Sequence, residues 1–381
     1  MFNILLLGLT SFFTDVSSEM IYPLVPFFLT LKLGASAELL GLIEGIAESV
    51  ASLLKVFSGY ISDRLKNRKG LTIVGYGSSA VGKLLLVIAN AWSMVLGARV
   101  VDRLGKGIRT APRDALIADS SPDGKRGSSF GLHRALDTGG AVVGVLLAYL
   151  FFTRLAQGEY TPVFVWSVVP AVIGVVLLFW VRETQPKAGK PAQLPSLRWS
   201  VLPRKLQLFL IVALLFTLGN SSNTFLLLRA QNLGFTPATA ILLYLVYNVV
   251  YGLVSYPAGR LSDKIGRKRL LVAGYAFYGL VYLGFARVNA PQQAWILWAL
   301  FGLYGLYIGF TEGIEKALVS DLAPANLRAT AIGLHATIIG IGLFPASFIA
   351  GQLWGRVGPA AAFYFGGGTG LIAAIGLMLV L

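Results

Sequence analysis

The chain has 381 residues, of which 56% are hydrophobic and 13% are charged, and its mean hydropathy is +0.72. This composition is typical of an integral membrane protein and excludes a water-soluble domain with a large core. The net charge of +15 does not indicate a nucleic-acid partner, because the basic residues sit in short loops between apolar runs. The chain has no cysteine, which excludes disulfides, thiol catalysis and thiolate metal sites.

The apolar runs, taken in chain order, predict twelve membrane-spanning helices, because a bilayer-crossing helix needs about 20 apolar residues. The approximate ranges are 3–31, 38–62, 71–91, 94–119, 128–152, 162–182, 206–230, 237–259, 270–288, 293–318, 328–354 and 360–381. The first run is too long for a cleaved signal and contains no basic residue before Lys32, so it is expected to be the first span.

The longest polar segment lies between the sixth and seventh predicted spans. Residues 183–205 contain four prolines among lysines and arginines, a composition that cannot bury a core. The sequence therefore predicts a six-helix bundle over residues 1–182, a cytoplasmic linker over 183–205 and a second six-helix bundle over 206–381.

The distribution of basic residues predicts the orientation. With both termini in the cytoplasm, eighteen lysines and arginines fall in the inner loops and linker, and five fall outside. The outer five are Lys32, Arg154, Arg229, Arg287 and Arg356. Because cytoplasmic loops carry the excess of positive charge, both termini are expected to be cytoplasmic, in a multi-pass protein of the cell's inner (plasma) membrane.

Several short stretches of the chain occur twice. Residues 59–69 match residues 259–269, each with a glycine, a Ser-Asp pair and a burst of basic residues between two apolar runs. Residues 115–122 match 317–324 at an offset of 202. At the same offset Gly-Leu-His recurs, ending at His133 and His335. Two halves in the same orientation are typical of transporters with parallel repeats.

These residues resemble the major facilitator superfamily over the whole chain. The turn at 59–69 is similar to the family's signature between the second and third spans, and 259–269 is similar to its echo between the eighth and ninth. The first copy departs from the pattern at Lys66, where the family usually has glycine; the second keeps Gly266. Residues 103–107 are similar to the family's fourth-span motif, with Lys106 in the usual place of glutamine.

The fifth predicted span carries glycines that resemble the family's antiporter motif, although the Gly-Pro pair of drug/proton antiporters is missing. These glycines are Gly131, Gly139, Gly140 and Gly144. The resemblance implies two six-helix bundles related by a pseudo-two-fold repeat, which rock about a cavity lined by the first, fourth, seventh and tenth spans. It also implies a cytoplasmic gate built from the two turn motifs. The gate residues would be Gly59, Asp63, Arg64, Arg68, Gly259, Asp263 and Arg267.

Charged residues inside the predicted spans are functional candidates, because an uncompensated charge in the membrane costs several kcal/mol. Fifteen lie in the first half and three, Glu312, Glu315 and Lys316, in the second. The candidates for proton coupling are acidic residues of the first half: Asp15, Glu19, Glu44, Glu48 and Asp137. Two acidic groups one helical turn apart cannot both be ionised cheaply at low dielectric. The alternative is that they form fixed ion pairs with arginines of the fourth and fifth spans.

The fourth predicted span carries a basic stripe formed by Arg99, Arg103 and Lys106, with Arg113 two turns further on. A guanidinium matches a carboxylate or phosphate in bidentate fashion, so such a cavity stripe indicates an anionic or zwitterionic solute. Alternatively, Arg103 and Lys106 neutralise Asp15 and Glu48 and never touch solute. The predicted solute cavity comprises Arg99, Arg103, Lys106, Arg134, Asn220, Asn223, Tyr307 and Glu312.

Three groups of the second half are interpreted mainly as structural. Glu312 and Lys316 have the i, i+4 spacing of a helix ion pair. Tyrosines at helical spacing are interpreted as interhelix packing, with Tyr307 able to reach the cavity. The symmetric placement of His133 and His335 favours packing or a gate hydrogen bond over metal binding, and no metal site or resident cofactor is expected.

The sequence predicts a secondary transporter that moves a small organic solute by alternating access, with proton-coupled efflux as the first choice. The alternatives are proton-coupled uptake of an organic anion, and export of metal ions or lipid by the same fold. An enzyme is disfavoured, because the chain shows no nucleotide-binding glycine loop, metal-ligand cluster or nucleophile with a base at a recognised spacing. The expected partners are the lipid bilayer and the solute, and the protein is expected to be a monomer.

Overall fold

The computed structural model describes residues 2–65, 67–122, 126–183, 199, 202–289, 293, 295–324 and 327–381. Within these ranges the regular structure is entirely helical. A few side chains inside the helices lie outside the description, namely Val56, Tyr60, Asp63, Arg126, Arg328, Ala329 and Thr330.

The chain packs as two compact units. Unit 1 contains Met1–Gly34 and Ile46–Leu194, and unit 2 contains Ala35–Gly45 and Pro195–Leu381. The first turns of one long helix therefore belong to unit 2 and its remainder to unit 1. The domain bounds 1–182, 183–205 and 206–381 stay a prediction, and most of the linker lies outside the described residues.

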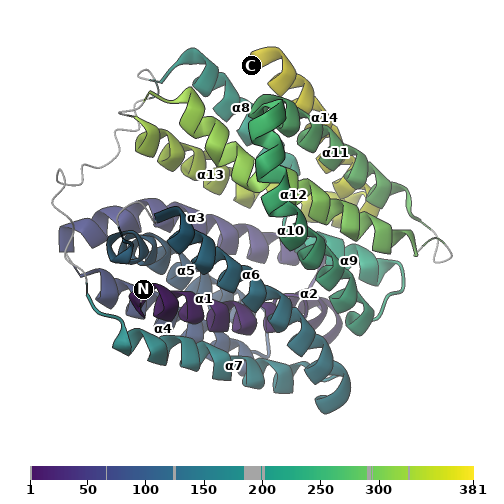
Figure 1. The fold of residues 1–381 in the computed structure, drawn as a ribbon. Helices are drawn as coiled ribbons and strands as arrows, with labels where there is room; N and C mark the ends of the chain where they lie inside the picture. Colours follow the sequence, from purple (N-terminus) through teal and green to yellow (C-terminus); the bar gives the residue numbers. More distant parts are fainter. Residues whose placement is uncertain are drawn as a thin grey trace. The chain divides into compact units, whose positions relative to one another are not determined.

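Unit 1 is built around long helices that pack side by side. They are α1 (Phe2–Ile21), α2 (Val25–Phe27) with a π-helical turn (Phe28–Lys32), α3 (Ala37–Leu65), α4 (Arg68–Val87), α5 (Trp92–Ser120), α6 (Arg126–Leu150) with a π-helical turn (Phe151–Leu155), and α7 (Tyr160–Leu177) with a 3-10 turn (Leu178–Trp180). α1 lies against α6 and α7, and α4 lies against α5 and α7 (Figure 1).

Glycines set the closest helix approaches in unit 1. A Cβ on Gly140 of α6 would collide with the backbone of Phe12 in α1, and one on Gly144 would lie 2.5 Å from the carbonyl oxygen of Val16. Small residues let membrane helices approach in this way. The fifth-span glycines of the family pattern therefore differ in role. Gly140 and Gly144 permit the close contact with α1, whereas a Cβ on Gly131 would meet only open space.

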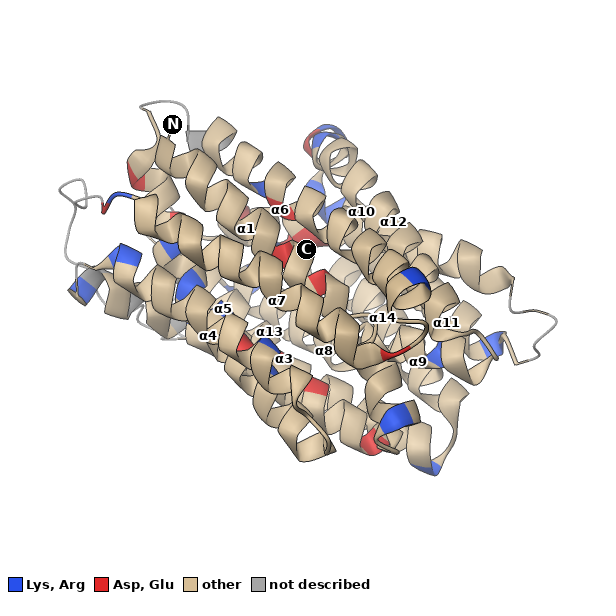
Figure 2. Ribbon diagram, turned by 90° about the horizontal axis from the view of Figure 1, so that it is seen from below, with Lys and Arg blue, Asp and Glu red and all other residues tan. Residues whose placement is uncertain are grey.

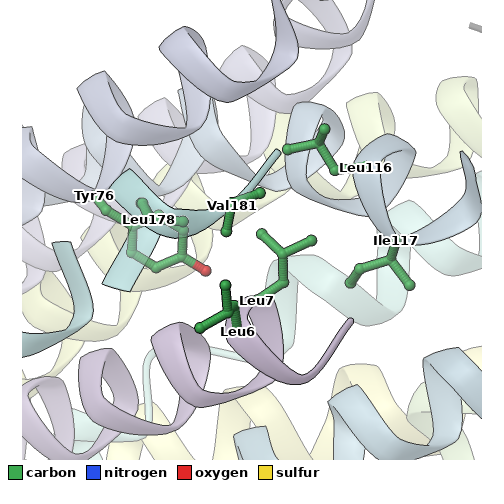
Figure 3. Packing of buried hydrophobic residues seen from close by; sticks show 7 residues of the cluster. All are labelled: Leu6, Leu7, Tyr76, Leu116, Ile117, Leu178 and Val181. Atoms are coloured by element: carbon green, nitrogen blue, oxygen red, sulfur yellow. The ribbon is translucent and has the colours of Figure 1, made fainter. Parts of the chain in front are cut away.

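An apolar cluster fixes α1 against α4, α5 and the end of α7 (Figure 3). Its members are at most 8% exposed: Leu6, Leu7, Tyr76, Leu116, Ile117, Leu178 and Val181. Tyr76 is the one member with a polar end, so this packing also places a hydroxyl between the helices.

Unit 2 repeats the same kind of packing. Its helices are α8 (Arg204–Gly219), α9 (Thr224–Asn232), α10 (Pro237–Ile265), α11 (Arg267–Arg287), α12 (Ile296–Leu322), α13 (Arg328–Arg356) and α14 (Pro359–Val380). α11 packs on α14 and α12, and α8 packs on α13 and α14.

Ten helical runs in the described chain are long and apolar enough to cross a membrane. α3 and α5 are not among the ten, although each has 29 residues, because both contain many charged residues. The seventh span, expected to be continuous over 206–230, is interrupted between Gly219 and Thr224, where four consecutive polar residues end α8 before α9 begins. Large apolar side chains remain exposed on the outer helix faces, Leu253 at 72% and Leu379 at 81%, as expected for surfaces that contact lipid.

Candidate functional site

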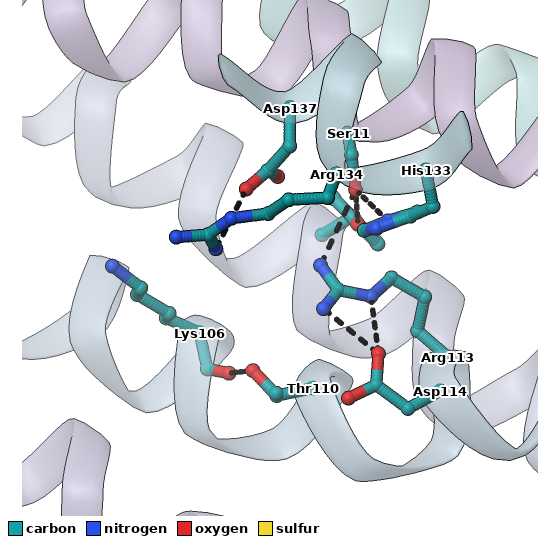
Figure 4. Close-up of polar contacts among 9 residues, drawn as sticks. Ser11, Lys106, Thr110, Arg113, Asp114, His133, Arg134 and Asp137 are labelled. Carbon is teal, nitrogen blue, oxygen red and sulfur yellow. Dashed lines mark hydrogen bonds and ion pairs between the residues drawn. The ribbon is translucent and has the colours of Figure 1, made fainter. Parts of the chain in front are cut away.

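Ser11 is the centre of a buried polar network in unit 1 (Figure 4). Its hydroxyl lies 2.8 Å from Nε2 of His133 and 2.9 Å from the hydroxyl of Tyr76, and it accepts a hydrogen bond of 3.2 Å from Arg113. Ser11 and Tyr76 are each 2% exposed and His133 is 5% exposed. The network joins α1, α4, α5 and α6, and neither Ser11 nor Tyr76 was a sequence candidate, because single uncharged residues in an apolar run give no signal.

The same face of α1 brings Asp15 to Asp137. α1 and α6 run in the same direction, since Phe12 meets Gly140 and Val16 meets Gly144. One helical turn after the Ser11–His133 contact, Asp15 therefore faces Asp137, and the two carboxyl groups are close enough to interact directly. Two ionised carboxylates in such a position repel each other strongly at low dielectric.

Basic groups surround this carboxyl pair. Arg134 lies 3.5 Å from Asp137, at the i, i+3 spacing expected from the sequence, but its side chain is 56% exposed. Lys106 and Arg109 both act electrostatically on Asp15. Arg109 is 6% exposed, stacks its guanidinium 4.4 Å from the ring centre of Tyr76 and donates to Ser79 of α4.

Lys106 is distinctive among the basic residues of α5. Its positive charge attracts the carboxyl groups of both Asp15 in α1 and Glu48 in α3. Within the described residues, however, its ammonium group makes no hydrogen bond or ion pair, whereas the neighbouring Arg113 is bonded to Asp114 at 2.8 Å (Figure 4). Lys106 is thus the α5 cation best placed to receive a ligand.

The other basic residues of the predicted stripe are held by unit 1 itself. Arg103 forms an ion pair of 2.8 Å with Glu48, with side chains 9% and 28% exposed. Arg99 is buried and lies 5.6 Å from the ring centre of Tyr22. The Arg103–Glu48 geometry fits the fixed-ion-pair alternative raised from the sequence.

Two more predicted residues lie beside this network. Lys83 of α4 is 4% exposed and donates to the carbonyl of Thr14 in α1 at 3.4 Å, close to Asp102. Glu19 lies one turn beyond Asp15 on α1, as its spacing predicted, and is half-buried. Lys83 was not placed in the site from the sequence; its burial shows that it belongs to the same cluster.

The basic turn motifs hold the helix ends of each unit. Arg68 pairs with Asp119 in unit 1, and Arg267 pairs with Asp321 in unit 2 and lies 3.7 Å from Asp263. The partners Asp119 and Asp321 occupy equivalent positions of the repeat. Gly59 packs against Ala111 of α5, whereas Gly259 has open space.

Two other gate residues were predicted at the end of α3. The side chain of Asp63 lies outside the described part of the chain, and Arg64 is exposed at the end of α3.

In unit 2 the polar interruption between α8 and α9 contacts buried tyrosines. Asn220 donates to Tyr307 at 3.1 Å, and Asn223 accepts from Tyr304 at 2.7 Å. Tyr307 is 2% exposed and packs among aromatic rings, so it is mainly a packing residue that presents its hydroxyl to Asn220. Tyr278 donates to the carbonyl of Gly219, which satisfies one backbone group left free where α8 ends.

Two of the acidic residues predicted for the site, Glu44 and Glu312, belong to unit 2 and are bonded to neighbouring hydroxyl groups. Glu44, at the start of α3, is 1% exposed and accepts a hydrogen bond from Ser222 at 3.2 Å. Glu312 accepts from Tyr251 at 2.5 Å. Within the described residues, no cluster of three His, Asp or Glu side chains could hold a metal ion.

Figure 2 shows the charged residues placed along the helices. The strongest concentration of buried charge is in unit 1, where Lys83, Arg99, Arg103 and Arg109 are each at most 7% exposed. Helices that hold several buried ionisable groups in a membrane are where ion or solute pathways occur. This cluster in unit 1 is therefore the candidate transport site.

Known transporters match the chain over nearly its full length. The model of the Major Facilitator Superfamily matches residues 7–228 and 208–381. An uncharacterized MFS-type transporter of Methanocaldococcus jannaschii is 39% identical over 384 residues, 99% of this chain and 94% of the relative. The multidrug resistance protein MdtG of Dickeya zeae is 27% identical over 309 residues, 77% of this chain and 74% of MdtG. A mutant form of the nucleoside transporter NupG superposes with a TM-score of 0.85 over 100% of both chains at 12% identity, a likeness of fold alone. The chain belongs to the Major Facilitator Superfamily and is a multi-pass membrane transporter, not an enzyme.

Proposed function

We propose that this transporter exports a small organic solute in exchange for protons, by alternating access, and that Asp15 and Asp137 form its proton site. The supporting observation is the pair itself, two carboxyl groups that face each other where α1 and α6 approach closely at Gly140 and Gly144. Loss of the shared proton would place two negative charges side by side at low dielectric, which costs several kcal/mol unless a cation approaches. Proton release at this site therefore depends on what its basic neighbours are bound to.

Lys106 supplies that dependence. An anionic group of the solute that binds Lys106 withdraws its charge from Asp15, and the departure of the solute returns it. The proposed solute is therefore anionic or zwitterionic. Arg134, half-exposed beside Asp137, is the second residue proposed to contact the solute.

The direction of transport is proposed from the named relatives. The multidrug resistance protein MdtG of Dickeya zeae is similar over 77% of this chain, and removal of a compound from the cell is the direction of transport that would give resistance to it. We further propose twelve spans, with α3 and α5 completing the ten apolar runs, both termini in the cytoplasm, a monomer, and a location in the cell membrane. The charges of α3 and α5 are compatible with spanning because Glu44, Arg99, Arg103 and Arg109 are buried against other helices and Glu48 is paired with Arg103.

The test is solute-driven proton movement in proteoliposomes that contain the purified protein, screened over organic anions, zwitterions, cations and neutral compounds. We expect an anion or zwitterion to drive a pH change in wild type. In Asp15→Asn and in Asp137→Asn the pH change should fall to the level of empty liposomes, while exchange of labelled solute persists. Asp114→Asn is the matched control, because that carboxylate is 42% exposed and already paired with Arg113.

An undiminished pH change in both Asp15→Asn and Asp137→Asn would exclude the pair as the proton site. Proton and solute movement in the same direction would identify the uptake alternative. Counterflow of a divalent cation in place of an organic solute would identify metal-ion export. Movement of a labelled lipid would identify lipid export.

A further inference from the structure

The repeat places three residues of unit 2 where unit 1 has its polar network. Tyr275 follows Gly274 as Tyr76 follows Gly75, 199 residues apart. His335 stands 202 residues after His133, and Glu315 stands 202 residues after Arg113. The three residues come from α11, α12 and α13, the counterparts of α4, α5 and α6.

Helix packing supports this equivalence. A Cβ on Gly75 of α4 would lie 2.5 Å from Cβ of Arg109 in α5. A Cβ on Gly274 of α11 would lie 2.6 Å from Cγ2 of Thr311 in α12. Arg109 and Thr311 are themselves 202 residues apart, so the two helix pairs touch at the same level in both units.

The chemistry of the central residue differs between the units. In unit 1 that residue is Arg113, whose guanidinium stays charged at every physiological pH and is bonded to Asp114 and Ser11. In unit 2 it is Glu315, which can gain or lose a proton. The repeat has thus kept the tyrosine and the histidine and exchanged a permanent cation for a titratable acid.

The Glu315 carboxyl group is surrounded by groups that can share a proton. Oε1 accepts a hydrogen bond of 2.9 Å from Tyr275, and Oε2 lies 3.6 Å from Nε2 of His335. The side chains of Glu315 and His335 are 13% and 4% exposed. Nε2 of His335 is fully buried and makes no hydrogen bond within the described residues, and Phe209 of α8 stacks on the ring with centroids 6.0 Å apart.

Among the described residues, no lysine or arginine forms an ion pair with Glu315. Tyr307 lies two helical turns before it on α12. Glu312 on the same helix is bonded to Tyr251 of α10, and Lys316 is exposed. α14, which packs on α8, α11 and α13, contains no charged residue.

We propose that unit 2 binds a proton at the Tyr275–Glu315–His335 triad, separately from the Asp15–Asp137 pair. The proton comes from water and neutralises the triad, either as a carboxylic acid beside neutral imidazole or as an imidazolium beside carboxylate. Both forms carry no net charge, whereas the proton-free form leaves a buried carboxylate that only Tyr275 stabilises. One transporter would then hold two exchangeable protons, one in each unit.

The test is pH-difference infrared spectroscopy of the purified full-length protein in nanodiscs, recorded without solute. We expect one titrating carboxyl signal to disappear in Glu315→Gln. Its midpoint should shift by about one pH unit in His335→Gln, the size of effect that a neighbouring charge or hydrogen bond has on a carboxyl group. The matched controls are Glu312→Gln and His133→Gln, which should leave the Glu315 signal unchanged. Glu315→Asp should restore a titrating signal and so separates a lost proton site from a misfolded protein.

A carboxyl signal that titrates identically in wild type and His335→Gln would overturn the proposal, as would a difference spectrum that Glu315→Gln does not change. Asp15→Asn should leave the Glu315 signal intact even though it abolishes solute-driven proton movement. Failure of the triad proposal is therefore distinguishable from failure of the Asp15–Asp137 proposal.

Discussion

A single uncharged side chain organises the charges of unit 1. The hydroxyl of Ser11 contacts His133, Tyr76 and Arg113, which come from three different helices. Ser11 gives the buried Tyr76 and His133 a hydrogen-bond partner and adds one to Arg113, so one hydroxyl lowers the cost of burying polar groups from three helices. Charged residues draw attention in a membrane sequence, but here their geometry depends on a serine.

Arg103 and Glu48 are expected to act as a structural pair. Removal of either partner takes away the 2.8 Å ion pair of the remaining charge, and breaking a buried pair in this way typically destabilises by about 3 kcal/mol or more. Arg103→Met alone and Glu48→Met alone should each lower the apparent melting temperature by several degrees. The double variant should recover much of the loss, because it removes both charges. The measurement is thermal unfolding of purified protein in detergent.

Lys32→Ala is the control for that series, since Lys32 and Glu159 form a pair of 3.5 Å whose side chains are 57% and 63% exposed. Its effect should stay within about 0.5 kcal/mol. Equal destabilisation by the single and double variants of Arg103 and Glu48 would contradict the structural-pair interpretation.

The sequence could predict that Asp15, Glu48 and Asp137 lie inside the membrane, because a charge within an apolar run is visible at once. It could not predict which basic group each would meet, since spacing fixes neighbours along one helix and not across helices. Arg134 and Asp137 illustrate this limit. The expected i, i+3 pair is present, yet Asp137 also faces Asp15 on another helix.

At the scale of elements, the contact between α1 and α6 determines the geometry of the carboxyl pair. Gly140 and Gly144 let the helix backbones approach closely, and that approach faces Asp15 toward Asp137. The glycine pattern was visible in the sequence, but only the structure separates glycines that are packed from glycines that are not.

The interruption between α8 and α9 was not predicted from the sequence. The predicted seventh span included the four polar residues of this interruption in one apolar run. These side chains need hydrogen-bond partners, which lipid around an uninterrupted helix would not provide.

Gly140→Ala should destabilise the protein, because the new Cβ would collide with the backbone of Phe12, which cannot move aside as a flexible side chain could. Overpacking of this kind typically costs about 1–3 kcal/mol. The yield of monodisperse protein and its thermal unfolding temperature should both fall. Gly131→Ala in the same helix meets nothing within 4 Å and should be neutral or slightly stabilising. Equal behaviour of the two variants would mean that the α1–α6 approach is not tight at Gly140.

At the scale of the whole molecule, the repeat is the feature that the sequence predicted best. The Arg68–Asp119 and Arg267–Asp321 pairs are formed by equivalent residues in both units. Identical short motifs impose similar local contacts, so the repeat could be recognised without a structure. The division of α3 between the two units could not, because its apolar pattern continues through Gly45.

The absence of cysteine makes the proposed orientation directly testable. Lys264→Cys and Arg154→Cys each introduce one thiol at an exposed position of the chain. With cytoplasmic termini, a membrane-impermeant maleimide added to intact cells should label the cysteine at 154 and should label the one at 264 only after permeabilisation. The reverse pattern would show that the topology is inverted, and labelling of both would place the two turns on one side.

The contacts of α1 also bear on how the protein is made. α4 and α5 follow one another in the chain and can pack as soon as both have entered the membrane. α1 packs on α6, more than 100 residues later, so at about 10 residues per second its partner emerges from the ribosome roughly ten seconds after it. Throughout that interval Ser11 and Asp15 lie in the nascent bilayer segment without His133 and Asp137. During insertion α1 therefore depends on water or the insertion machinery to shelter its polar groups until α6 arrives.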